Sequence, residues 1–533
     1  MSTLVETKIG SHETCIWKAT LFLGLAIMMT RVTNFFTQVV IAHQFGTGFE
    51  ADAYFVVENI MLLLTDFIIT GFSVAYIPIW MEYKVKKGEL EAQRFDDAFV
   101  TTTAVATLFF AVIVFFAAPL LIRLAAPGFS DLTYQTAVNL LMTITPALAF
   151  LGLTAACTGI LQANRRFVVP ELSYMFYNLV VLLAAILFVA KFGLIGLTGG
   201  IIFGAFLRLL IQLLVARRVS PMRLSLQFKH EGVLIVLKRV FPIFFAYAGI
   251  QFTILAGNMV ASVAAEGAVS RLIYASRVML IPVGLLALPL QITIFPTLSH
   301  QVAQNQIKEL GKTVIKGFCM LGFTTIPATA GLVLLRTPLV QLLYERGAFG
   351  PAATSATADM LGWYALGIPG IAGLMIVNSL YSSLGEPITL VLFNLINWVT
   401  TVGLSWVLIQ KFGSTAIAFS ISLSTIATCL FALWSSKRRL AELDMRFLGV
   451  SIYKSSVATG VMVIVLIGFQ IFLTKGLITT SISISIQSLI TILSVFFVGM
   501  VTYGVTAYSL KIVEMRTLVN NFSQWISQQG LIR

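Results

Sequence analysis

The feature that most constrains this chain is a succession of apolar stretches, each about as long as a bilayer is thick. A helix needs about 20 apolar residues to cross a membrane, and fourteen such stretches can be marked along the 533 residues. The chain is 58% hydrophobic and 11% charged, whereas soluble domains are about 25% charged. We therefore predict an all-α integral membrane protein of about 14 transmembrane helices. The predicted spans are 16–43, 52–80, 97–122, 134–161, 168–190, 194–216, 233–262, 270–297, 313–335, 358–381, 387–410, 414–435, 452–474 and 484–508.

The placement of the basic residues predicts the orientation of these helices. If the N-terminus is inside, most of the 35 Lys and Arg residues fall in the two termini and the even-numbered loops, as in the runs 84–87 and 437–439. This asymmetry is what the positive-inside rule requires. It explains the net charge of +13 without nucleic acid as a partner. We expect both termini to be cytoplasmic, and we expect the first helix to be retained because it is too long for the apolar region of a signal peptide.

An internal repeat predicts two related halves. At an offset of about 220 residues, Pro78 of YIPIW aligns with Pro296 of IFPTL, and Gly193 of KFGLIG aligns with Gly413 of KFGSTA. An even number of helices in each half makes the two copies parallel, with a cavity expected between them. The predicted division is an N-lobe of helices 1–6 (1–230), a C-lobe of helices 7–12 (231–446), and helices 13–14 with a cytoplasmic tail (447–533).

Two arginines at membrane depth are the candidate substrate-binding residues. Arg31 lies about midway along the first predicted helix, and Arg277 lies in the eighth, so each half supplies one. A charge at this depth costs about 2.5 kcal/mol or more, and such a residue usually faces a cavity or a partner. A guanidinium suits bidentate contacts with phosphate oxygens, which favours an anion site. A salt bridge or a helix cap is the alternative for each.

Three acids of the second predicted helix complete the candidate site. Asp52 lies at the outer start of this helix, where the helix dipole favours a carboxylate, and simple capping of the helix is the alternative for it. Glu58 and Asp66 lie deeper and are candidates for pairing with the arginines, for gating or for ion coupling. Arg208, nearer the cytoplasmic end of the sixth helix, is expected to extend its charge to the surface.

Signatures of catalysis, metal binding and nucleotide binding are missing from the sequence. The four histidines stand apart from one another, and the four cysteines lack paired spacing. ELGKT, around Lys312, lacks the earlier glycine of a phosphate-binding loop. We expect a transporter with no catalytic residue, no metal and no cofactor, driven by the membrane potential or by a monovalent cation. A membrane enzyme that processes glycans is the alternative from another class.

Several motifs resemble one family. TRVTNFFTQVVIAHQFGTGFEADAYFVV, LAAPGFS, LYERGAFG and IYASRVMLIPVGLLALPLQITIFPTLS are similar to segments of the MurJ/MviN family, within the superfamily that also holds MATE drug exporters and O-antigen flippases. The resemblance runs from about residue 20 to 440. It implies a flippase that carries lipid II, the undecaprenyl-diphosphate-linked peptidoglycan precursor, across the bacterial inner membrane. The implied partners are this glycolipid and membrane lipids, with no nucleotide, and we expect a monomer.

The functional pattern of that family matches this chain in part. The resemblance implies substrate-binding roles for Arg31, Asp52 and Arg277. A second arginine of the first helix, followed by an acid, is replaced by Thr37-Gln38. The paired arginines and the glutamate of the second helix are absent, with Thr65-Asp66 and Thr70 in their places.

These departures leave fewer positive charges for a diphosphate and keep other substrates open. The alternatives are another lipid-linked oligosaccharide, as for exopolysaccharide or O-antigen, and a cation-coupled multidrug exporter. The resemblance also implies that the last two helices form a groove for the prenyl tail.

Overall fold

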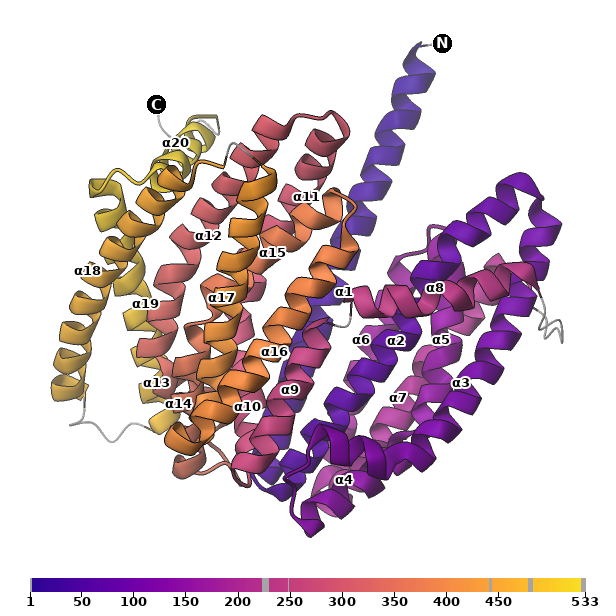
Figure 1. Ribbon diagram of the computed structural model, residues 1–533, viewed down its shortest axis with the longest axis horizontal. Coiled ribbons are helices and arrows are strands. Elements are labelled where there is room, and N and C mark those ends of the chain that lie inside the picture. The colour runs from indigo at the N-terminus through magenta and orange to yellow at the C-terminus, as the bar shows by residue number, and fades with distance from the viewer. Residues whose placement is uncertain (1, 223–229, 248, 441–442, 478–482, 529–533) are drawn as a thin grey trace. The chain divides into compact units, whose positions relative to one another are not determined.

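The structure is a computed structural model that describes residues 2–222, 230–247, 249–440, 443–477 and 483–528. Within these ranges the regular elements are α-helices, apart from one π-helical turn (Figure 1). Twelve helices of the described part are long and apolar enough to cross a membrane, or thirteen if one bent pair counts as a single span. The predicted all-α membrane fold is therefore confirmed, while the number 14 stays a prediction.

The chain folds into two compact units, residues 1–259 and 260–533. This boundary separates two sets of helices that pack mainly among themselves. The predicted boundary at 230/231 instead separates two sequence repeats, and it stays a prediction. The helices that begin in the first unit are α1(Ser2–Phe45), α2(Phe49–Lys86), α3(Glu89–Ala125), α4(Asp131–Ile144), α5(Pro146–Ala163), α6(Val168–Leu187), α7(Val189–Val219), α8(Glu231–Tyr247) and α9(Gly249–Ala264).

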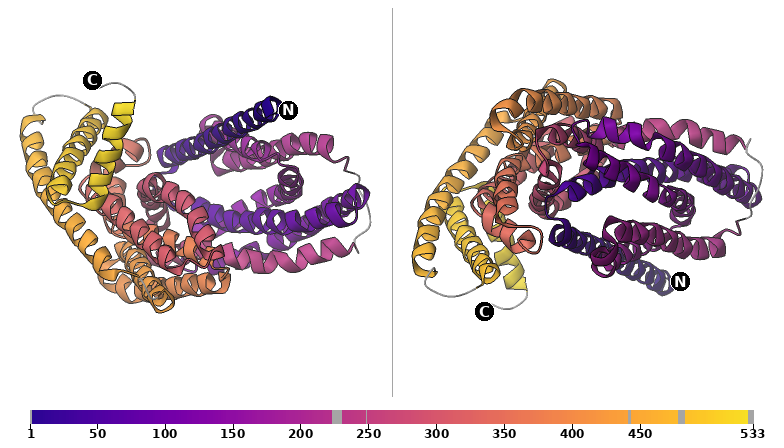
Figure 2. Two further views of the ribbon diagram at one scale, coloured as in Figure 1. Left: turned by 90° about the horizontal axis from the view of Figure 1, so that it is seen from above. Right: turned by 90° about the horizontal axis from the view of Figure 1, so that it is seen from below.

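The second unit contains the remaining elements. They are α10(Ala268–Pro282), the π-helical turn η1(Val283–Ala287), α11(Leu288–Ala303), α12(Ile307–Leu334), α13(Arg336–Tyr344), α14(Pro351–Ala365), α15(Ile368–Ser383), α16(Pro387–Phe412), α17(Thr415–Arg439), α18(Met445–Leu477), α19(Ile484–Ser509) and α20(Val513–Gln528). Helices α18 and α19 pack against each other and contact α12 and α13 of the same unit (Figure 2).

Prolines break two of the predicted spans. The span predicted at 134–161 is α4 followed by α5, and α5 starts at Pro146. The span predicted at 358–381 is α14 and α15, which meet at 45° just before Pro369. Proline is favoured in the first turn of a helix, where its missing N–H has no partner to lose, and it restricts the residue before it. Each proline therefore starts a new helix segment.

The backbone repeats itself in the two units. Eight of the ten described residues with positive φ form pairs separated by 217 to 221 positions: Gly46 and Gly267, Gly88 and Asn305, Arg165 and Gly385, Gly193 and Gly413. Gly193 (φ 55°, ψ −141°) and Gly413 (φ 59°, ψ −147°) even share a conformation that is reserved almost entirely for glycine. Contacts repeat as well, since α5 packs on α7 and α6 on α7 as α15 packs on α17 and α16 on α17. The predicted similarity of the two halves thus has a structural counterpart.

Glycines allow close packing of helices within each unit. A Cβ on Gly159 of α5 would lie 3.0 Å from the ring of Tyr76 of α2, and a Cβ on Gly373 of α15 would overlap Sγ of Cys429. Small residues at helix contacts are typical of membrane proteins, where van der Waals contact between helices replaces hydrophobic attraction.

Candidate substrate-binding residues

Arg31 projects from the exposed side of α1. Its neighbours Thr30 and Thr33 are buried, and Oγ1 of Thr33 donates to the carbonyl oxygen of Met29 over 2.9 Å. Such bonds satisfy hydroxyl groups inside an apolar helix. The part of the chain that the structure describes shows no ion pair to Arg31. The predicted contact of Arg31 with substrate stays a prediction.

Asp52 lies in the first turn of α2 and is 2% exposed. Its backbone N–H donates to the carbonyl of Gly48 over 3.1 Å, so the residue belongs to the beginning of the helix, where a carboxylate is stabilised by the helix dipole. The capping alternative stays open. Its predicted contact with substrate stays a prediction.

Glu58 joins α1 to α2. Nε2 of Gln38 in α1 donates to Oε1 of Glu58 over 3.2 Å, and Oη of Tyr54, one helical turn before Glu58, lies 3.4 Å from the same oxygen. Gln38 is 2% exposed. Thr37 and Gln38 stand where the family that this sequence resembles has an arginine followed by an acid. At this position of the chain, a neutral side chain binds the acid of α2.

Asp66 lies two helical turns beyond Glu58 and contacts another helix. Its Oδ2 accepts a hydrogen bond from Nε2 of Gln251 in α9 over 3.0 Å. Asp66 is exposed, so its carboxylate can reach solvent or a bound cation. Glu58 and Asp66 have separate partners on separate helices.

Arg208 does not extend to the surface, and that prediction was wrong. Its side chain is 7% exposed, and its guanidinium carbon lies 4.6 Å from the ring centre of Tyr174 in α6. The rings of Tyr174 and Tyr177 stack 5.9 Å apart. A cation over an aromatic face is stabilised electrostatically, the more so when it is desolvated. No sequence pattern identified this contact, because it depends on how α6 and α7 are rotated against each other.

Arg277 lies in α10 of the second unit and is partly buried. One turn earlier, Tyr274 is fully buried, with its ring 4.9 Å from that of Tyr344 and 5.4 Å from that of Phe349. After Arg277, α10 ends at Pro282 and continues into the π-helical turn η1. Such turns are frequent at functional sites. Arg31 and Arg277 belong to different units, so their predicted meeting at one cavity stays a prediction.

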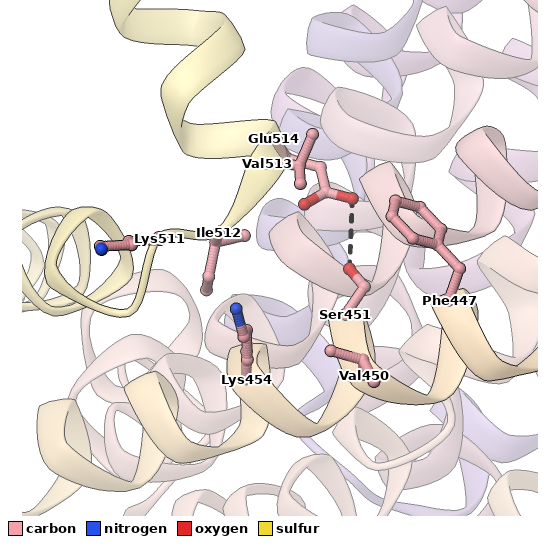
Figure 3. A pocket seen from close by; sticks show the side chains of 8 residues that line it. All are labelled: Phe447, Val450, Ser451, Lys454, Lys511, Ile512, Val513 and Glu514. Atoms are coloured by element: carbon pink, nitrogen blue, oxygen red, sulfur yellow. Dashed lines mark hydrogen bonds between the residues drawn. The ribbon is translucent and has the colours of Figure 1, made fainter.

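A small pocket lies at the beginning of α18, beside the turn between α19 and α20 (Figure 3). Ser451 Oγ donates to Oε1 of Glu514 across it over 3.1 Å. Lys454 and Lys511 also line it. This pocket lies at one end of the two C-terminal helices, whereas the groove expected for a prenyl tail would run along their apolar length.

Comparison with known proteins gives a consistent result. The profile of the family described as "Lipid II flippase MurJ" matches residues 41–488, well over half of the chain. A "Probable lipid II flippase MurJ" from Buchnera aphidicola subsp. Schizaphis graminum is 25% identical over 425 residues, which cover 79% of this chain and 83% of that protein. A "Lipid II flippase MurJ" from Burkholderia cenocepacia is 28% identical over 370 residues, which cover 67% of this chain and 71% of that protein.

Solved structures agree on the fold. A lipid II flippase MurJ in an inward closed conformation superposes with a TM-score of 0.78 at 24% identity, covering 92% of this chain and 99% of that one. A multidrug resistance MATE family transporter of the MOP superfamily, in an inward-facing conformation, gives a TM-score of 0.68 at 12% identity and covers 80% of this chain. From the profile match along most of its length, this multi-pass membrane protein belongs to the lipid II flippase MurJ family.

Proposed function

We propose that this chain translocates lipid II from the cytoplasmic to the periplasmic leaflet of a bacterial inner membrane by alternating access. The observation that carries the proposal is the profile match over residues 41–488, which includes Arg277 and the second-helix acids. Arg31 precedes the matched range, and its exposed position in an apolar helix supports the same function.

The chemistry of the two arginines suits a diphosphate. A guanidinium remains charged at any physiological pH and offers planar pairs of N–H donors to phosphate oxygens. Arg31 in the first unit and Arg277 in the second would contact the head group, while the prenyl tail stays in lipid. Asp52, Glu58 and Asp66 would act in gating or coupling.

The energy for transport would come from the membrane potential or from a monovalent cation. One charge moved across 100 mV gains about 2.3 kcal/mol, and the protein would need no nucleotide. Glu58 and Asp66 are the acids at membrane depth that could respond to a cation. We propose a monomer with both termini in the cytoplasm, in keeping with the distribution of Lys and Arg.

Arginine replacement tests this proposal. The variant Arg31→Ala, Arg277→Ala should fail to support growth when it replaces the native copy, although it inserts into the membrane. Arg31→Lys should retain part of the function, because an ammonium keeps the charge but loses the planar pair of donors. Arg218→Ala, at the exposed end of α7, is the matched control and should support normal growth. Full growth with the correctly inserted double variant would refute the role of the two arginines.

A different polyprenyl-diphosphate glycan is the second candidate substrate. Gln38 and Asp66 favour it, since Gln38 is neutral where the family pattern has an acid, and Asp66 is an acid where that pattern is positive. Gln38 donates a hydrogen bond to Glu58, and Asp66 accepts one from Gln251. Depletion of the protein separates the two candidates by the glycolipid that accumulates.

A further inference from the structure

A buried carboxylate lies outside the candidate site, where α2, α3 and the end of α7 meet. Asp96 of α3 is 2% exposed. Oη of Tyr76 in α2 donates a hydrogen bond to Oδ1 of Asp96, and Oγ of Ser220 donates to Oδ2 over 2.7 Å. In the ranges that the structure describes, no basic side chain forms an ion pair with Asp96. Neutral groups therefore surround its charge, namely the hydroxyl groups of Tyr76 and Ser220 and the nearby indole of Trp80.

Contacts with α3 position both ends of the connection between α7 and α8. Ser220 is the first residue after α7, and the carbonyl of the next residue, Pro221, accepts a hydrogen bond from Nε2 of Gln93 over 3.2 Å. At the other end, Gly232 in the first turn of α8 lies so close to α3 that a Cβ would be 2.9 Å from the ring of Phe95. Gln93, Phe95 and Asp96 form one turn of α3. This turn is the anchor of the connection between the two predicted repeats.

Burial makes the charge of Asp96 costly. A carboxylate removed from water without a cationic partner is destabilised relative to its neutral form, and hydrogen bonds from neutral donors offset only part of that cost. We propose that Asp96 is a proton-binding residue that fastens the end of α7 to α2 and α3 when charged and releases it when protonated. Protonation turns one acceptor oxygen into a donor that faces a hydroxyl group. Both hydrogen bonds then lose their charged acceptor and one of them must reverse its direction, so the two contacts weaken.

Other titratable groups border the same region and must be separated from Asp96. Tyr76 faces it from α2, and Asp97 is its neighbour on α3. At the start of α8, the ring of His230 lies 5.5 Å from that of Phe95, and Glu231 follows it. His230 titrates in the range where acid release would be measured. A test must therefore include a variant of each acidic or basic neighbour that could give the same response.

Hydrogen exchange measures the fastening directly, without substrate. In full-length protein in lipid nanodiscs, the amides of residues 214–220 and 222 would be followed by mass spectrometry between pH 5 and pH 8, with rates corrected for the intrinsic effect of pH. We expect corrected exchange to rise about tenfold on acidification, which is the change expected when a hydrogen bond to a charged acceptor becomes a hydrogen bond between neutral groups. Asp96→Asn, which is permanently neutral, should show fast exchange at every pH. Asp97→Asn, His230→Gln and Glu231→Gln should keep the wild-type response.

The exchange results test the role of Asp96 without any measurement of transport. Exchange in the wild-type protein that is independent of pH would overturn it, and so would a pH response that survives in Asp96→Asn. If Asp96→Asn does not fold, Tyr76→Phe serves instead: it retains the carboxylate but removes a donor that stabilises the charged form, so its response should begin at higher pH. An unshifted response in Tyr76→Phe would contradict the proposed role. The consequence for transport, that a proton alters the connection between the repeats, rests on the proposed function and is tested only by growth of these variants.

Discussion

The contact between α15 and α17 offers a quantitative test of the packing in the second unit. Gly373 of α15 has no room for a side chain, because a Cβ there would overlap Sγ of Cys429 in α17 and would lie 3.0 Å from the ring of Phe318 in α12. Both neighbours are buried, so they cannot turn out into open space. Gly373→Ala gains about 1 kcal/mol of helix propensity. Overpacking of this kind costs about 1–3 kcal/mol, and two buried neighbours place it near the upper end, so we expect a net loss of about 2 kcal/mol.

A compensating substitution separates the clash from other effects. Cys429→Ala removes the sulfur that the new methyl group meets, at a cost of about 1 kcal/mol for the small space it leaves. In the double variant the methyl group introduced at position 373 would occupy that space. The double-mutant cycle should therefore show a favourable coupling of about 1–3 kcal/mol, as expected for residues in contact.

Thermal unfolding followed by size-exclusion chromatography of a fluorescent fusion would rank these variants. The midpoint should fall for Gly373→Ala and recover when Cys429→Ala is added. Gly403→Ala is the matched control, because Gly403 lies within α16 with nothing within 4 Å of a Cβ, and it should raise the midpoint slightly. A midpoint of Gly373→Ala equal to that of the wild type, or no recovery in the double variant, would refute this description of the contact.

Three further predictions concern the first unit. Glu58→Ala should lower the unfolding midpoint, because buried Gln38 loses its acceptor at a cost of about 1–3 kcal/mol in the free energy of unfolding. Glu58→Gln should unfold near the wild-type midpoint. Equal midpoints for the two variants would contradict the contact. Tyr174→Leu should lower the free energy of unfolding by about 1–2 kcal/mol more in the wild type than in the Arg208→Met background, because only the wild type loses the cation–π contact. Additive effects of the two substitutions would exclude that contact. Burial lowers the pKa of His230, so the folded state favours the neutral imidazole. The stability that this gives is complete above the unfolded pKa of about 6.5. It is lost as the pH falls from that value toward the folded pKa. Hydrogen exchange of residues 231–236 should accordingly rise on acidification in the wild type but not in His230→Phe, and a response that persists in the variant would point to another group.

The sequence was sufficient for the class of fold because membrane spanning depends on local composition. A run of about 20 apolar residues requires a helix whatever its neighbours are, so each predicted span has helical residues where the structure describes it. The aligned pair Gly193 and Gly413 was also visible in the sequence, and both adopt the same positive-φ conformation. The short helices α13 and α20 were not predicted, because neither has the length or the apolar run of a span.

Contacts between helices could not be predicted from the sequence. Arg208 was expected at a surface, but it stacks on Tyr174 because α6 and α7 turn these side chains toward each other. The replacement at Gln38 was recognisable as a departure from the family pattern, whereas its hydrogen bond to Glu58 depends on the register of α1 against α2. The pair Asp96 and Ser220 is separated by more than a hundred residues and carries no motif. Such pairs are fixed by helix rotation and register, which the pattern of apolar residues does not determine.

Identification of the glycolipid that depends on this protein tests the central claim most directly. The protein would be depleted in its native host, and each undecaprenyl-linked intermediate would be quantified and assigned to a leaflet by its accessibility to an enzyme added outside. Our account predicts that lipid II accumulates on the cytoplasmic leaflet and that the Arg31→Ala, Arg277→Ala variant does not restore its exposure. Normal exposure of lipid II together with accumulation of another lipid-linked glycan would contradict it.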